Sequence, residues 1–380
     1  MKNTVPMVKR THAKAKAGRR QFLLAAGAGV AASAMPQVSR AQTVSWKIQS
    51  SWTQKDIFHE FALDYARKVS EMTGGRLSLE VLTTGTVVPA FQLQDAVHAG
   101  ILNGGHGTSV NWYRKHKAAA LFGSPPSLGW DAHSMLAWFY HGGGEALYKE
   151  LVNDLLKLNV TGIPYFPMPT QPLGWFTKEI KSAEEFKGMK YRTVGVAADL
   201  FKELGAEVSN LAGRDIVRAM NRSLIDGAEL NNPSSDLTAG LPDAAKFYMM
   251  GSHHRQLEVF EIIFNKAKHD ALPAEMKSIL RYAALASSTD QLGMAYNRYP
   301  KDLEEIKKRG VNVVKTNDAV LNEQLAAWDR LIAAYSKDPF FAKVLASQKA
   351  WVKRTQPYLQ VNNLGSATLA AAYTHFFSKA

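Results

Sequence analysis

The chain contains no cysteine among its 380 residues. This absence excludes disulfides, thiolate metal sites and cysteine nucleophiles. Beyond the N-terminal segment no run reaches the roughly 18 apolar residues of a membrane-spanning helix. We therefore expect a soluble mature protein that needs no oxidative folding.

Several motifs of catalytic chemistry are also missing. The sequence has no Walker A motif, no G-x-G-x-x-G between a strand and a helix, and no HExxH. The run "YHGGGEA" (140–146) resembles the oxyanion-hole loop of esterases, but that chemistry requires a G-x-S-x-G nucleophile elbow, which the chain lacks. A turn or helix start is therefore favoured there, and a secreted hydrolase stays open only as an alternative. His253 and His254 have no zinc-site spacing, so we expect a loop or interface pair.

The net charge of +13 comes mostly from one segment. Residues 1–42 hold eight basic residues and no acid, which leaves 38 basic against 33 acidic residues in the rest of the chain. No basic run with interleaved aromatic residues follows. We therefore do not expect a nucleic-acid partner.

The N-terminal segment has the pattern of an export signal. Arg19 and Arg20 precede Phe22 and a mildly apolar run, and "SRA" ends at Ala41 with small residues at the −3 and −1 positions. The RR-x-F-L pattern is typical of twin-arginine signals. The sequence predicts that residues 1–41 are a cleaved twin-arginine signal peptide and that the protein is periplasmic.

The mature chain alternates strand and helix patterns twice. "VSWKIQSSW" predicts a strand, "DIFHEFALDYARKVSEM" a helix, and "RLSLEVLTTG" another strand, and a similar rhythm returns after residue 160. Such alternation favours parallel pairing in α/β units. The last third reads almost wholly as helix. The predicted fold is therefore α/β, with a cleft between two lobes and a helical C-terminal region.

One charged side chain falls in a costly position. Arg192 in "GMKYRTVG" should end a buried strand, where an unpaired guanidinium costs several kcal/mol. Its partner is either a structural Asp or Glu or an anionic ligand. Three loops that follow strand or helix ends also carry polar groups suited to a ligand or a hard cation. These groups include Gln171, then Ser109, Asn111, Trp112 and Tyr113, and finally Glu229, Asn231 and Asn232.

Five segments, in order, resemble the solute-binding proteins of tripartite ATP-independent periplasmic (TRAP) transporters, the DctP family. They are "DAVHAGILNGGHGTS", "AWFYHGGGEAL", "QPLGWF", "KGMKYRTVG…LFKELGAEV" and "SLIDGAELNNPSSD". The strand "EVFEIIFNKAKHDALP" fits as well. The resemblance covers about residues 44–350 and looks closest to the branch that binds 2-oxo acids and other small carboxylates with a metal ion.

The resemblance implies a two-lobed periplasmic receptor, not an enzyme, that closes over a small organic acid such as a 2-oxo acid or lactate. It implies lobe I at 43–168 and about 258–297, lobe II at 169–257 and about 298–340, and a C-terminal helical segment at 341–380. The implied partners are membrane permease subunits and a second copy bound through the C-terminal helices. A ligand-binding sensor-adaptor is the alternative, which neighbouring permease genes would exclude.

The resemblance also implies the site residues. Arg192 matches the arginine that pairs with the substrate carboxylate, so we expect its alanine variant to lose ligand affinity without losing ligand-free stability. The expected substrate-binding residues are Arg192, Gln171, Asn111, Trp112, Asn232 and Glu229. Gln171, Glu229 and the backbone carbonyl of Leu230 match the ligands of a Na⁺ or Ca²⁺ ion, and no organic cofactor is expected. Two departures from the branch are Leu230, where an aromatic residue is typical, and "GSHHRQL" (251–257), where an aromatic–Glu–Gly pattern is typical.

Overall fold

The structure is a computed structural model that describes residues 43–363 and 365–377. The predicted signal peptide therefore lies outside the described residues. Within those residues, no helix combines the length and the apolar composition that crossing a membrane requires.

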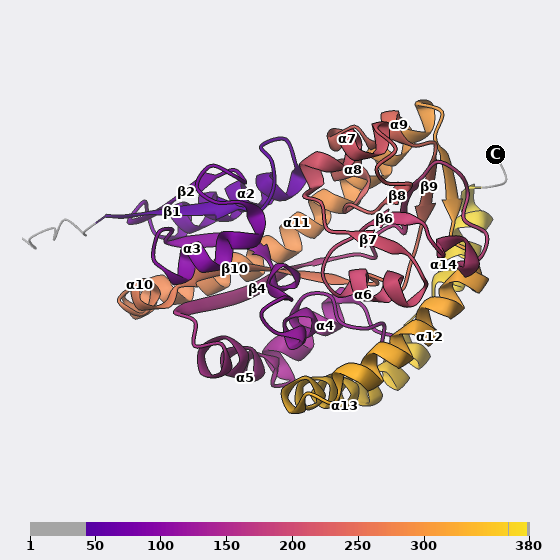
Figure 1. The fold of residues 1–380 in the computed structure, drawn as a ribbon. Coiled ribbons are helices and arrows are strands. Elements are labelled where there is room, and N and C mark those ends of the chain that lie inside the picture. Colours follow the sequence, from indigo (N-terminus) through magenta and orange to yellow (C-terminus); the bar gives the residue numbers. More distant parts are fainter. Residues whose placement is uncertain (1–42, 364, 378–380) are drawn as a thin grey trace, which may run out of the picture. The chain divides into compact units, whose positions relative to one another are not determined.

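In the described part of the chain the strands form two sheets (Figure 1). From edge to edge, the first sheet contains β2 (Leu77–Leu82), β1 (Val44–Ser50), β3 (Gly104–Thr108), β10 (Glu258–Asn265) and β4 (Val160–Met168). The second contains β11 (Asn312–Lys315), β9 (Phe247–Met250), β5 (Gly174–Phe176), β8 (Gly227–Ala228), β6 (Lys190–Arg192) and β7 (Glu207–Ser209). We call these sheet A and sheet B.

Helices connect and cover the strands. The α-helices are α2 (Ile57–Met72), α3 (Leu93–His98), α4 (Ala132–His141), α5 (Gly144–Lys149), α6 (Val196–Glu203), α7 (Ile216–Asn221), α8 (Pro233–Ala239), α9 (Leu241–Ala244), α10 (Lys266–Asp270), α11 (Ala274–Lys308), α12 (Asp318–Tyr335), α13 (Pro339–Asn362) and α14 (Ser366–Phe377). Short 3-10 turns are η1 (Ala90–Gln92), η2 (Ser109–Trp112), η3 (Lys117–Phe122), η5 (Ala183–Phe186) and η6 (Gly213–Asp215), and η4 (Glu150–Leu155) is a π-helical turn.

Helices pack on both faces of each sheet, as the apolar residues of the central strands require. In sheet A, α2 and α11 pack on one face, and α4, α5 and α13 pack on the other. In sheet B, α6 and α12 cover one face, while α7, α9 and the end of α11 cover the other. The predicted α/β class is confirmed.

The prediction of parallel pairing is only partly correct, because both sheets are mixed. In sheet A, β10 runs antiparallel to both β3 and β4. The reason is the path of the chain: β4 leads from sheet A into sheet B, and β10 returns from sheet B into sheet A beside it. Because β4 runs toward sheet B and its neighbour β10 runs away from sheet B, the two strands are antiparallel.

The chain therefore passes between the sheets through residues 169–173, through residues 251–257 and along α11. The strands of sheet A fall within the predicted lobe I segments and those of sheet B within the lobe II segments. The lobe boundaries themselves stay a prediction.

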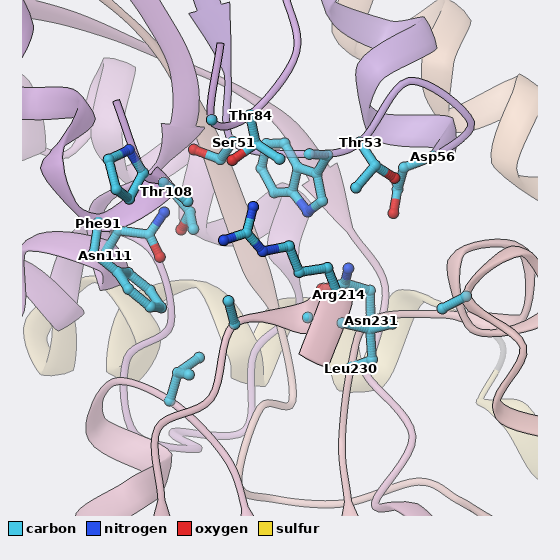
Figure 2. Close-up of a pocket in the computed structure, with 18 of the residues that line it drawn as sticks. Ser51, Thr53, Asp56, Thr84, Phe91, Thr108, Asn111, Arg214, Leu230 and Asn231 are labelled. Carbon is cyan, nitrogen blue, oxygen red and sulfur yellow. The ribbon is translucent and has the colours of Figure 1, made fainter. Parts of the chain in front are cut away.

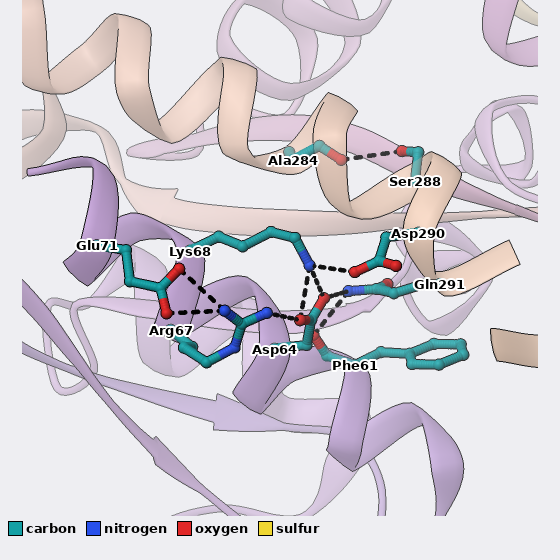
Figure 3. Close-up of polar contacts among 9 residues, drawn as sticks. All are labelled: Phe61, Asp64, Arg67, Lys68, Glu71, Ala284, Ser288, Asp290 and Gln291. Atoms are coloured by element: carbon teal, nitrogen blue, oxygen red, sulfur yellow. Dashed lines mark hydrogen bonds and ion pairs between the residues drawn. The ribbon is translucent and has the colours of Figure 1, made fainter. Parts of the chain in front are cut away.

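The long helix α11 is fixed to α2 by a polar cluster (Figure 3). Asp64 of α2 accepts hydrogen bonds from Lys68 and from Gln291 of α11, the latter at 3.0 Å. Lys68 also reaches Asp290 at 2.7 Å. Farther along, α11 packs against α8, on the side of sheet B (Figure 1). One helix thus supports elements that line both sides of the cavity described below.

Candidate functional site

A cavity of about 350 Å³ lies where the ends of sheet A strands face the ends of sheet B strands. Ser51, Trp52, Thr84, Phe91, Thr108 and Asn111 line it from the sheet A side (Figure 2). Arg214, Leu230 and Asn231 line it from the sheet B side, as do Arg192 and Val194. The volume lies in the range of small-molecule sites.

Arg192 is the last residue of β6 and is only 4% exposed. Its Nη1 lies 3.1 Å from Glu229 Oε1 and donates to the Glu229 carbonyl oxygen at 2.7 Å, and its Nε donates to the Leu211 carbonyl oxygen at 2.8 Å. Strand β8 is parallel to β6 and ends at Ala228, so Glu229 emerges at the same sheet edge as Arg192. The buried arginine therefore has a protein carboxylate as partner before any ligand arrives.

Glu229 is fully buried and also accepts a hydrogen bond from the Gln171 side-chain amide. Burial raises the pKa of Glu229, but the charges of Arg255 and Arg192 outweigh burial and hold its pKa below the ordinary value. Glu229 is therefore ionised at neutral pH. Gln171 is fully buried as well, so the structure brings these two predicted residues together behind the cavity wall.

A second buried arginine, Arg255, faces the same cavity from the connection between β9 and β10. Its Nη1 lies 3.3 Å from Glu258 Oε2 and 3.5 Å from Gln171 Oε1, and its Nη2 donates to the Val194 carbonyl oxygen at 2.9 Å. Burial raises the pKa of Glu258 despite the opposing charge of Arg255. The cavity wall thus holds two buried guanidinium groups with two buried glutamates.

Asp56 adds a third buried acid to the cavity. It is the N-cap of α2, accepting from the Phe58 N–H at 2.9 Å, and it accepts from Ser235 Oγ of α8 at 3.0 Å. Burial raises its pKa to about 7. The contact with Ser235 joins the sheet A side of the cavity to the sheet B side.

Arg214 is the most accessible charged side chain that the cavity lining contributes. Figure 2 shows the Arg214 guanidinium extending from the side of Leu230 and Asn231 toward the side of Ser51 and Asn111. The Arg214 side chain is 65% exposed, and its Nε lies 3.8 Å from Asp215. This arginine is solvated, unlike Arg192 and Arg255.

Four of the six predicted binding residues do not line this cavity. Gln171 and Glu229 lie behind its wall, and the other two, Trp112 and Asn232, are bound elsewhere in the structure. The indole of Trp112 points into the core of sheet A and donates to Glu261 at 2.6 Å. Asn232 is the N-cap of α8 and accepts from the Ser234 and Ser235 amides. Both side chains therefore bind other groups of the protein, which their position after a strand or helix did not reveal.

The HGGG run and the two adjacent histidines both have structural roles in the fold. Gly143 of the HGGG run has φ of 90° and is the N-cap of α5, so the run is the predicted turn and helix start. His254 is buried against Ser252, and the half-buried His253 contacts Ser127. Within the described residues, no cluster of three or more His, Cys, Asp or Glu side chains could hold a metal ion.

Arg255, Glu258 and Asp56 line the cavity but were not predicted from the sequence. Glu258 could have been noticed as an acid at the start of a largely apolar strand, in which every residue is buried. Arg255 lies in a connecting segment without periodicity, so no pattern predicted its burial. Asp56 directly precedes a predicted helix, so its position in the sequence indicates only a helix N-cap.

Comparison with known proteins identifies the family. Residues 48–338 match the model of bacterial extracellular solute-binding protein family 7, DctP. A monocarboxylate 2-oxoacid-binding periplasmic protein of Nostoc sp. is 29% identical over 364 residues, which cover 93% of this chain and 99% of that protein.

Solved structures agree in fold. A TRAP periplasmic solute-binding protein of Colwellia psychrerythraea, with bound calcium and pyruvate, is 28% identical with a TM-score of 0.79, covering 85% of this chain and 98% of that chain. One of Pseudoalteromonas atlantica, with bound sodium and pyruvate, is 27% identical with a TM-score of 0.79, covering 88% and 100%. The predicted kinds of ion, sodium or calcium, are those found in these relatives, and neither is described with an organic cofactor. The chain therefore belongs to the DctP family of TRAP transporter solute-binding proteins, which are receptors and not enzymes.

Proposed function

We propose that this chain is a periplasmic receptor that captures a small monocarboxylate, such as a 2-oxo acid or lactate, and delivers it to the membrane permease of a TRAP transporter. The observation that carries the proposal is the buried Arg192 side chain in the wall of a 350 Å³ cavity. The pyruvate bound to two relatives and the 2-oxoacid specificity named for a third support the ligand class.

Arg192 would hold the ligand carboxylate. Its Nε and Nη1 have protein acceptors, but no described residue accepts a hydrogen bond from Nη2, and the side chain lines the cavity. A charge-assisted bond from this nitrogen would supply both energy and orientation. The Asn111 side-chain amide could donate a hydrogen bond to the 2-oxo or 2-hydroxyl oxygen of the ligand. Trp52 and Phe91 offer apolar surface for its carbon chain.

Thermal shift measurements test this function. A ligand that binds only the folded receptor raises its melting temperature by mass action. Pyruvate, 2-oxobutyrate and lactate should stabilise the purified protein, whereas pyruvamide, which lacks the carboxylate charge, should not. The measurement is made with sodium, with calcium and without either ion. If none of the carboxylates raises the melting temperature under any of these conditions, the proposal fails.

The oxygens that would hold a sodium or calcium ion in this chain are the Gln171 amide oxygen, the Glu229 carboxylate and the Leu230 carbonyl. Oxygen donors suit both ions. However, Glu229 Oε1 contacts Arg192, Glu229 Oε2 accepts from Gln171, and Gln171 Oε1 contacts Arg255. The donor chemistry fits a hard cation, but the arrangement does not leave these oxygens free.

We expect ligand affinity to rise as pH falls from 8 to 6. Asp56 lines the cavity with a pKa of about 7, and an entering carboxylate disfavours its ionised form. Binding therefore takes up a proton. If only protonated Asp56 is compatible with ligand, affinity should fall roughly tenfold between pH 6 and pH 8.

Asp56→Asn is the matched variant for this pH dependence, because an amide oxygen can still cap α2 and accept from Ser235. Calorimetric titration of pyruvate should give the variant a nearly constant affinity over this range. His254, whose pKa burial lowers to about 3, stays neutral throughout. An unchanged pH dependence in Asp56→Asn would show that another group takes up the proton.

Export is proposed to use the twin-arginine pathway. The basis is Arg19 and Arg20 ahead of Phe22, with cleavage after Ala41. Replacing both arginines by lysine should leave unprocessed precursor in the cytoplasm, measured by fractionation and immunoblotting. Normal periplasmic accumulation of that variant would contradict the proposal.

A second copy of the chain is the proposed partner of the C-terminal helix α14. This helix buries none of its described side chains, and Leu369, Tyr373, Phe376 and Phe377 are more than half exposed. Apolar surface of this kind marks an interaction site. Sedimentation should show a dimer for the full mature chain and a monomer after truncation at residue 363; two monomers would reject this interface.

A further inference from the structure

The position of Arg255 bears on which cation accompanies the ligand. Its side chain is 4% exposed and lines the cavity, and none of the described residues accepts a hydrogen bond from its buried Nε. The guanidinium contacts Gln171 Oε1 at 3.5 Å and Glu258 Oε2 at 3.3 Å. A positive charge is thus built into the wall beside the oxygens that would hold a metal ion.

The charges around these oxygens are already balanced. Two guanidinium groups, Arg192 and Arg255, face two carboxyl groups, Glu229 and Glu258. The charge of Arg255 is the largest influence that lowers the pKa of Glu229. An added metal ion would have to displace Arg255 from Gln171 and would then lie close to two positive side chains in a poorly solvated site.

We propose that the Arg255 guanidinium does in this chain what calcium or sodium does in the pyruvate-bound relatives, so that the ligand carboxylate binds between Arg192 and Arg255 without a metal ion. The planar guanidinium supplies positive charge and directed N–H donors, which suit a carboxylate. This inference rests on the proposed function. It predicts a metal-independent receptor within the same family.

The direct test is calorimetric titration of pyruvate into purified protein treated with chelator, in potassium buffer free of sodium and calcium. We expect the same dissociation constant, within about twofold, when calcium or sodium is added back, and elemental analysis should show no stoichiometric calcium. Binding that disappears on chelation and returns with either ion overturns the inference but leaves the proposed function intact. Absence of pyruvate or other carboxylate binding under every condition instead rejects the proposed function.

Variants separate the roles of the arginines. Arg255→Met combined with Glu258→Gln keeps the cluster neutral, so the protein should fold, as melting curves can verify, but lose at least about 30-fold in metal-free affinity, the typical loss for a buried charge contact. Glu258→Gln alone keeps Arg255 and should retain binding. Arg222→Met removes an exposed arginine that does not line the cavity and is the matched control, with less than about fivefold loss.

Arg255→Glu provides the opposite test. It removes the guanidinium and adds a carboxylate near Gln171 and Glu229, which together form a set of oxygen donors suited to calcium. We expect this variant to bind pyruvate only when calcium is present and to retain calcium in elemental analysis. If Arg255→Met with Glu258→Gln binds pyruvate in the presence of chelator as tightly as the wild type, Arg255 does not hold the ligand carboxylate.

Discussion

Arg192→Ala should lose both ligand affinity and ligand-free stability. Affinity for the carboxylate should fall about 30-fold or more, since breaking a desolvated charge contact typically costs roughly 2–5 kcal/mol. The free energy of unfolding should fall by about 3–5 kcal/mol, because the fully buried Glu229 would lose the guanidinium that contacts its carboxylate at 3.1 Å. This corrects the sequence-based expectation that ligand-free stability would hardly change.

Two further variants separate these effects. Arg192→Met with Glu229→Gln removes both charges together, so stability should largely return while affinity does not. Arg192→Lys should not restore affinity, because an ammonium group cannot reproduce the planar fork that meets Leu211 and Glu229. Calorimetry and melting of each ligand-free protein give the two readouts. Retained affinity in Arg192→Met with Glu229→Gln would mean that the carboxylate is held elsewhere.

The position of Arg192 could be predicted, but its partner could not. Local patterns indicate a buried strand end, and the cost of burying charge indicates that some anion is present. The identity of Glu229 as that anion depends on β8 lying beside β6 in sheet B. Strand order is set by how distant segments pack together, and a single sequence contains no local signal for it.

The same reasoning explains the other differences. The helices α2 and α12 follow apolar periodicity and were predicted from sequence, as was β10. The antiparallel direction of β10 follows from the chain's return between sheets, which no local pattern encodes. Arg255 is buried only because that return passes beside Gln171 and Val194. Sequence patterns thus predicted the elements, while the contacts between crossing segments determine the site.

Gly195→Ala should prevent the two sides of the cavity from meeting. Gly195 precedes α6 with φ of 67°, and a Cβ atom there would lie 2.1 Å from Val110 Cγ1 on the sheet A side. With ψ of −145° this backbone lies in a region that is populated almost only by glycine. It costs an alanine about 1–3 kcal/mol, and the clash adds to that cost. We expect at least a tenfold loss of affinity for pyruvate, equivalent to about 1.4 kcal/mol, together with a larger radius of gyration in X-ray scattering.

The clash and the backbone strain can be distinguished. Gly188→Ala is the matched control, because Gly188 has φ of 73° but nothing within 4 Å of its Cβ position. It should lower the melting temperature without weakening ligand binding. Adding Val110→Ala to Gly195→Ala removes Cγ1, and the remaining Val110 Cβ lies at an ordinary 3.6 Å. The double variant should therefore recover most of the lost affinity while keeping the lower stability. If it binds no better than Gly195→Ala, backbone strain rather than contact with Val110 limits closure.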